Sequence, residues 1–207
     1  MKVDVVKSSI KLAPEGMQGA IIAQIIDLGT QENKFDPNKG KERRVWVSYE
    51  LPDCKFETED GEEVTHLIGK EYSAKLSGKS YLRLAIEAGL GKKLEDGKPF
   101  DLEKAIGLKV NVDVVHKKNA KGEDKARVED VKALVKGQKV SRGMRDQFVF
   151  SLDNIDDKML ASLPEFLQDI IMKSDEYEAY TDGGYEKKVK GKKAPAKKAA
   201  PARGNKR

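Results

Sequence analysis

Cysteine, aromatic residues and long apolar runs are all scarce in this chain of 207 residues, of which 38% are hydrophobic and 6% aromatic. The single cysteine, Cys54, excludes a disulfide within the chain, which fits a reducing compartment. The sequence has no apolar run that reads as a membrane span, and its N-terminal segment does not read as a signal peptide. We therefore expect a soluble intracellular protein with a modest core or a partly unfolded chain.

Charge is distributed unevenly, although the formal net charge is only +5. Residues 187–207 hold ten Lys and Arg and no acid, whereas residues 141–186 hold eleven acids against four Lys and Arg. Such asymmetry indicates interaction with partners more than it informs on folding. The predicted organisation is a nucleic-acid-binding domain over 1–137, a linker over 138–150, an acidic helical segment over 151–180 and a disordered basic tail rich in Lys, Ala and Pro over 181–207.

The stretch 41–53 reads as a long strand around which the rest of the chain is organised. Alternation gives it two faces, and the core face consists of Val45, Val47, Tyr49 and Leu51. The opposite face places Trp46, the only tryptophan, beside Arg44. An aromatic side chain next to cations on an open sheet suits single-stranded nucleic acid, which needs a stacking surface and charges for its phosphates. The alternative is that Trp46 covers a small apolar patch or lies under the N-terminal segment.

Further patterns give the order of the elements. The predicted elements are a strand over 17–28, a hairpin over 55–76 that turns at Asp60-Gly61, a helix over 77–90, a short helix over 101–106, and strands over 108–116 and 125–135. Pro52 and Asp53 predict the end of the strand before the hairpin, Gly69 and residues 129–130 predict bulges, and Asn111 is expected to point outward. Five main strands with a helix between the third and the fourth predict a mainly β fold, a five-stranded OB-fold barrel.

A helix is also predicted within the acidic segment. It begins near Pro164, because proline suits a first helical turn. Its apolar stripe consists of Leu163, Phe166, Leu167 and Ile170. The stripe either docks on the barrel, which is the more frequent outcome for such a helix, or binds a partner protein.

A resemblance to one known family rests on five stretches of the chain. They are KLAPEGMQGAIIAQIIDLGTQ, RRVWVSYELPD, GKEYSAKLSGKSYLRLAIEAGLG, FDLEKAIGLKVNVDVVHKKNAKG and SLPEFLQDIIMKSDEY. These stretches resemble the OB-fold single-stranded DNA-binding proteins of tailed bacteriophages, over about residues 10–180. The resemblance implies non-catalytic binding of displaced single strands in phage replication, recombination or repair, in the cytoplasm of the infected bacterial host. The usual bacterial single-stranded DNA-binding protein has an acidic tail that recruits partners, whereas the tail here is basic.

Basic and aromatic residues on the second and third strands and on two loops form the candidate binding set, because these segments line the binding face of an OB-fold. The set is Lys34, Phe35, Lys39, Arg43, Arg44, Trp46, Lys70, Tyr72, Lys75, Lys79, Lys117, Lys118 and Lys121. Tyr72 is ambiguous, since its phase with Leu76 also fits the core. Binding through stacking and phosphate contacts is expected to tolerate any sequence and to weaken steeply with salt.

One motif imitates a nucleotide-binding loop. Residues 78–80, Gly-Lys-Ser, match the end of the phosphate-binding P-loop, but Ser73 stands where its first glycine is required. We expect instead that Ser77 or Ser80 caps the helix that follows. Lys79 remains a candidate for contact with a phosphate of bound DNA.

Signals for catalysis and for metal binding are weak. His66, His116 and Cys54 lack the paired spacing and the fourth ligand of a metal site. We therefore expect no enzymatic activity and no cofactor. Two other functions stay open: an adaptor that recruits phage replication or recombination proteins through residues 151–180, and a tail that coats duplex DNA or RNA. The sequence does not indicate an oligomeric state.

Overall fold

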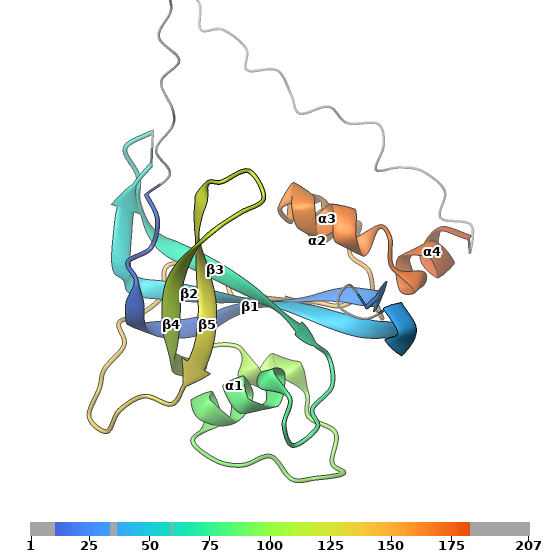
Figure 1. Cartoon of the computed structure of the whole chain (residues 1–207), viewed down its shortest axis with the longest axis horizontal. Helices are drawn as coiled ribbons and strands as arrows, with labels where there is room; N and C mark the ends of the chain where they lie inside the picture. Colours follow the sequence, from blue (N-terminus) through green and yellow to red (C-terminus); the bar gives the residue numbers. More distant parts are fainter. Residues whose placement is uncertain (1–10, 34–36, 59, 183–207) are drawn as a thin grey trace, which may run out of the picture.

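The computed structural model describes residues 11–33, 37–58 and 60–182. Lys34, Phe35 and the predicted tail beyond residue 182 lie outside the described residues. The described chain is mainly β, as the sequence predicts, and consists of one sheet with short helices around it (Figure 1).

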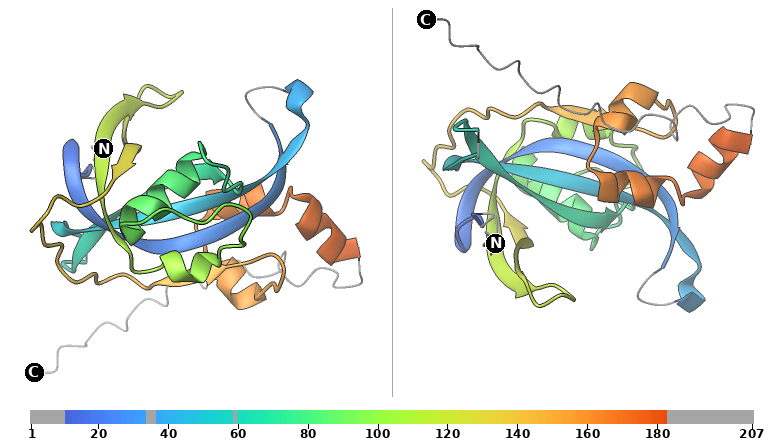
Figure 2. Two further views of the ribbon diagram at one scale, coloured as in Figure 1. Left: turned by 90° about the horizontal axis from the view of Figure 1, so that it is seen from below. Right: turned by 90° about the horizontal axis from the view of Figure 1, so that it is seen from above.

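The sheet has six strands, of which five pair antiparallel in the order β3-β2-β1-β4-β5. The sixth strand, β6, is short and pairs parallel with β1. The bounds are β1 Gly16–Glu32, β2 Lys41–Glu57, β3 Glu63–Ser73, β4 Lys109–Lys118, β5 Asp124–Lys132 and β6 Phe148–Phe150, with a 3-10 turn η1 Pro37–Lys39 before β2. β1 and β2 are each 17 residues long, so they extend well beyond the stretch of β1 that pairs with β4, and this extension supports the C-terminal helices (Figure 2).

The sheet is open between β3 and β5, the two ends of the strand order. No ladder joins these two strands in the described part of the chain. Lys70 in β3 spans the seam, because its Nζ donates to the carbonyl of Glu129 in β5 at 2.6 Å. The described sheet is therefore open, and closure into the five-stranded OB-fold barrel that the sequence predicts is not seen.

Hydrophobic side chains on one face of the sheet form the main core. The predicted core face of β2 is confirmed, since Val45, Val47, Tyr49 and Leu51 are all at most 3% exposed. The alternate valines of β4 lie in the same cluster. Asn111 of β4, predicted to point outward, is instead buried, because its amide exchanges two hydrogen bonds with Gln138. A polar partner far along the chain thus satisfies a side chain that alternation alone would place in solvent.

Two short helices close one end of this core (Figure 1). They are α1 Tyr81–Leu90 and the 3-10 helix η2 Leu102–Ala105, close to the predicted ranges. Ser80 Oγ accepts a hydrogen bond from the N–H of Arg83, and Gly91 ends α1 in the left-handed conformation. The N-cap at Ser80 is as predicted, so the Gly-Lys-Ser motif is explained by capping.

β2 continues past residues 52–53, where the sequence predicts its end. The pairing register with β3 shifts between Leu51 and Lys55, so the proline lies where the ladder is interrupted and no backbone donor is needed. The bulge predicted at residues 129–130 is confirmed by a register shift in the pairing of β4 with β5.

The stretch 138–150, predicted as a linker, packs on the sheet instead. Its last three residues form β6 beside β1. Glu50, which is fully buried in β2, accepts hydrogen bonds at Oε1 from the backbone N–H groups of Met144 and Arg145 at 2.6 and 3.2 Å. A buried carboxylate from a distant strand therefore fixes this stretch, which local composition does not reveal.

Three helices follow β6 and pack on the extension of β1 and β2 (Figures 1 and 2). They are α2 Asp157–Ser162, α3 Glu165–Ile171 and α4 Asp175–Asp182. Leu160, Leu167 and Ile171 are at most 1% exposed and form a second hydrophobic cluster with Ile26 and Phe150. The helix predicted near Pro164 is confirmed, and its predicted apolar stripe docks in part: Leu163 and Leu167 are buried, whereas Phe166 is 49% exposed.

Candidate nucleic-acid interface

A groove of about 330 Å³ lies at the open seam between β3 and β5. Residues 11–13, 66–69 and 125–127 line it together with Trp46. Three of the lining residues are Lys or Arg, and none is Asp or Glu, although the chain contains 35 acids. The groove is therefore suited to an anionic occupant.

Trp46 and Gly69 meet in this groove, on neighbouring strands. A Cβ atom at Gly69 would lie 2.1 Å from atoms of the Trp46 indole, so only glycine leaves room for the ring. Gly69 pairs with Ser48 in regular register, so the bulge predicted at Gly69 is wrong. The glycine instead allows the indole to approach the backbone of β3 closely.

Phe166 of α3 packs against Trp46 in an edge-to-face arrangement. The ring centroids are 5.3 Å apart and the ring planes form an angle of 71°. The indole is therefore partly buried and packs against the second hydrophobic cluster, which agrees with the alternative that Trp46 covers an apolar patch. The element that covers it in part is the C-terminal helix α3. Sequence reasoning assigned Phe166 to a docking stripe and did not connect it with Trp46, because no local pattern links two such distant positions.

The cations of the groove are Lys11, Lys125 and Arg127, none of which is in the candidate set from the sequence. Lys11 and Arg127 are exposed and form no ion pair with another described residue, whereas Lys125 lies 3.8 Å from Glu123. A signal for two of them is present in the sequence. Lys125 and Arg127 alternate with Ala126, which packs against the core, so both project from the opposite face of β5.

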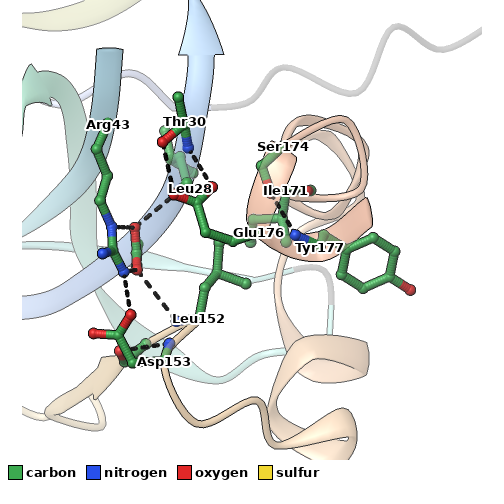
Figure 3. Close-up of polar contacts among 12 residues, drawn as sticks. Leu28, Thr30, Arg43, Leu152, Asp153, Ile171, Ser174, Glu176 and Tyr177 are labelled. Carbon is green, nitrogen blue, oxygen red and sulfur yellow. Dashed lines mark hydrogen bonds and ion pairs between the residues drawn. The ribbon is translucent and has the colours of Figure 1, made fainter. Parts of the chain in front are cut away.

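Arg43 lies elsewhere, where the sheet meets the C-terminal segment (Figure 3). Its guanidinium contacts the carboxylates of Asp27 at 2.5 Å and Asp153 at 2.8 Å. Asp27 also accepts hydrogen bonds from the backbone N–H groups of Gly29 and Leu152. The hydrogen bond to Asp27 is the main cause of a raised pKa for Arg43. Arg43 therefore has a structural role, because its ion pairs join the sheet to the C-terminal segment.

Further hydrogen bonds join α4 and α3 to β1 at the same place. The carboxylate of Glu176 accepts from both the backbone N–H and the hydroxyl of Thr30, each at 2.6 Å (Figure 3). The side chain of Gln31 donates to the carbonyl of Ile170 at 2.9 Å. We name this region the polar junction and define it as Asp27, Thr30, Arg43, Asp153 and Glu176.

Two more candidate residues lie inside the fold. Arg44 is 9% exposed, and its Nε lies 2.6 Å from a carboxylate oxygen of Glu71. Tyr72 is 4% exposed, and its hydroxyl lies 2.8 Å from that of Tyr49. Burial raises the pKa of both tyrosines well above the ordinary value. The core alternative for Tyr72 is confirmed, and this ring is not exposed for stacking.

Three candidate lysines have partners within the protein. Lys70 donates to the carbonyl of Glu129, and burial lowers the pKa of its ammonium group. Lys75 lies 3.6 Å from the carboxylate of Glu42. Lys117 forms an ion pair with the side chain of Glu129. Of these, Lys70 has the clearest structural part, because its bond spans the open seam.

The remaining described candidates, Lys39, Lys79, Lys118 and Lys121, are all exposed. Lys118 and Lys121 lie towards the tip of the β4–β5 hairpin, which projects from the sheet in Figure 1. Lys79 precedes α1, and Lys39 belongs to η1. Neither strand β4 nor the loop that holds these two hairpin lysines lines the groove, but the second strand of their hairpin, β5, does.

Groups of three or more His, Cys, Asp and Glu side chains placed to hold a metal ion are absent from the described ranges. His116 Nε2 lies 2.8 Å from the carbonyl of Ala13. The Cys54 thiol donates to the side chain of Gln18 at 3.4 Å, and burial raises its pKa. The side chains of His116 and Cys54 therefore each have a hydrogen-bond partner within the protein.

No helix in the described part of the chain is both long and apolar enough to cross a membrane. No protein-family model matches the chain, and no match is found among curated proteins.

Proposed function

We propose that this protein binds single-stranded DNA in the groove between β3 and β5, without catalysis and without preference for base sequence. One observation carries the proposal: three cations and Trp46 line the same groove, and no carboxylate does. Phosphates of a single strand need cations, its unpaired bases need an aromatic surface, and a carboxylate would repel the backbone.

We further propose that the sheet is an OB-fold opened between its third and fifth strands. The strand order β3-β2-β1-β4-β5, with α1 between β3 and β4, supports this assignment. An OB-fold is a partly open Greek-key barrel that binds oligonucleotides on its second and third strands and on the loops beside them. The groove contains Trp46 of β2 and residues 66–69 of β3, which agrees with that location.

The groove offers few groups that read base edges. Burial and the charge of Arg145 lower the pKa of His66, so this lining residue is a neutral imidazole at neutral pH. The other lining side chains are apolar or cationic. Stacking tolerates any base, and one stacked base contributes about 1–3 kcal/mol, so Trp46 with a few phosphate contacts is sufficient for useful affinity.

The resemblance to single-stranded DNA-binding proteins of tailed phages supports a role in phage DNA replication, recombination or repair in the host cytoplasm. The adaptor alternative has less support. Leu160, Leu167 and Ile171, the apolar residues that such a segment would offer to a partner, are buried against the sheet.

The first test is a titration of the full-length protein with oligo-dT and with a duplex of the same length. Emission from Trp46, the only tryptophan, reports on the groove rather than on the basic tail. We expect oligo-dT to quench this emission, to bind more tightly than the duplex and to dissociate as salt increases. Equal binding of the two DNAs with no quenching would place the contact in the tail and contradict the proposal.

A matched pair of charge reversals tests the groove itself. Arg127→Glu is expected to weaken oligo-dT binding about tenfold, the effect of losing roughly 1.5 kcal/mol from one charged hydrogen bond. Lys92→Glu makes the same change at an exposed position after α1, outside the groove, and is expected to leave the dissociation constant unchanged. An equal loss in both variants would mean that net charge, and not the groove, governs binding.

A further inference from the structure

Phe166 differs from the apolar residues nearest to it in and just before α3. Leu163, Leu167 and Ile171 are 5%, 1% and 0% exposed, whereas Phe166 is 49% exposed. Its ring nevertheless has a definite position, because it packs edge-to-face on Trp46. The helix thus leaves a large aromatic surface in solvent beside the tryptophan that lines the groove.

The position of Phe166 is fixed by the packing of α3. Leu167 and Ile171, its neighbours on the helix, are buried in the second hydrophobic cluster, and Gln31 in β1 donates to the carbonyl of Ile170. Displacing the helix would expose these side chains to water. The free-energy cost of that exposure is larger than the free energy gained by stacking one base in the vacated space. The packing of α3 therefore holds Phe166 beside the groove.

We propose that Phe166 is a second base-stacking residue, so that the C-terminal helical segment forms one wall of the DNA-binding site; this inference rests on the proposed function. In Figure 1, α3 and the β4–β5 hairpin both stand above β2 and β3. A base stacked on the face of Phe166 would lie close to Trp46, because the centroids of the two rings are 5.3 Å apart. Aromatic groups favour such offset and edge-to-face contacts.

The charges around the groove orient the strand. Glu165 and Asp169 are exposed on α3 next to Phe166, so this wall repels phosphates and accepts bases. Lys125 and Arg127 line the groove from β5 and attract phosphates. The bases of the bound strand therefore point towards α3, and its sugar–phosphate backbone runs along β5.

Two substitutions in the full-length protein test this role. Phe166→Leu keeps an apolar side chain but removes the ring, and is expected to weaken oligo-dT binding about tenfold, within the range for one stacked base. Phe166→Tyr keeps the ring and is expected to bind as the wild type does. Tyr81→Leu is the matched control, since Tyr81 is 69% exposed on α1 but does not line the groove. Equal affinities for Phe166→Leu and Phe166→Tyr would overturn the inference.

A cross-linking measurement on the wild-type protein needs no folded variant. Oligo-dT that carries 5-iodouracil is irradiated with the full-length protein, and the modified tryptic peptide is identified by mass spectrometry. We expect a cross-link in the peptide of residues 159–173, which contains Phe166. Cross-links that exclude this peptide would overturn the inference while leaving the proposed function intact. Absence of oligo-dT binding by the wild type, or normal binding by Arg127→Glu, would instead overturn the proposed function.

Discussion

The polar junction and the groove differ in whether their cations are paired with carboxylates. In the polar junction, Arg43 contacts the carboxylates of both Asp27 and Asp153. In the groove, Lys11 and Arg127 have no carboxylate partner among the described residues. The neighbours that the fold provides therefore decide the role of a cation, and the density of Lys and Arg in the sequence does not.

The two regions also differ in what they contribute to the free energy of folding. The Asp27 side chain is only 10% exposed and accepts backbone hydrogen bonds, so removing it leaves buried donors without partners. Exposed cations without a partner contribute little to stability and stay available for phosphates. Substitutions in the junction should therefore change unfolding, and substitutions in the groove should change binding.

The largest expected effect on stability follows from Asp27→Ala. It leaves Arg43 with one exposed carboxylate and should lower the free energy of unfolding by about 3 kcal/mol, as for a partly buried pair that loses one partner. Urea unfolding followed by circular dichroism measures this change. Asp60→Ala, in an exposed turn, is the control and should stay within about 0.5 kcal/mol of the wild type. Lost DNA affinity with unchanged stability would show that the junction belongs to the binding site.

Gly69→Ala should affect both properties, because the new Cβ would overlap the Trp46 ring. We expect a loss of about 2 kcal/mol in stability, typical of an overpacked site, with a shifted Trp46 emission maximum and weaker oligo-dT binding. Gly78→Ala is the control, since nothing lies within 4 Å of a Cβ at that position. Unchanged emission and affinity for Gly69→Ala would contradict the described position of Trp46.

A smaller effect is expected for Lys70→Met, which removes the hydrogen bond across the open seam. Stability should fall by about 1 kcal/mol, the usual contribution of one hydrogen bond. Lys92→Met is the control, because Lys92 is exposed after α1 and its substitution should stay within about 0.5 kcal/mol of the wild type. A large loss of DNA affinity in Lys70→Met at unchanged stability would show that Lys70 contacts DNA, as the sequence predicts.

The smallest effect concerns pH. Burial and Arg145 hold the pKa of His66 below its ordinary value of 6.5, so this side chain is neutral at pH 7 to 8 and binding should be constant there. Below pH 6.5 the unfolded state takes up this proton more readily than the folded state, so stability should fall. His66→Gln should remove that part of the pH dependence in urea unfolding, whereas His116→Gln should keep it. A stability that rises as the pH falls below 6.5 would contradict the described surroundings of His66.

The sequence predicts the strands well because alternation is a local property. The core face of β2, the N-cap of α1 and the bulge at residues 129–130 are all confirmed. The open seam between β3 and β5 could not be predicted, since it depends on how two strands far apart in sequence approach each other. The burial of Asn111 depends in the same way on Gln138, a distant partner.

The candidate site was harder to predict for the same reason. Arg43 and Arg44 attract attention as adjacent cations, but only the fold reveals Asp153 and Glu71 beside them. Trp46 was identified, whereas its contact with Phe166 comes from a helix at the other end of the chain. Sequence patterns therefore indicate which residue types are present, and the tertiary contacts determine which of them remain available to a ligand.

The salt dependence of oligo-dT binding, followed by Trp46 emission, tests the central claim most directly. For a single strand, each cation that contacts a phosphate contributes about 0.7 to the slope of log affinity against log salt concentration. The account predicts that Arg127→Ala lowers the magnitude of this slope by about 0.7, while Arg43→Ala leaves it unchanged as long as the protein is folded. An unchanged slope for Arg127→Ala, together with a reduced slope for Arg43→Ala, would contradict the account.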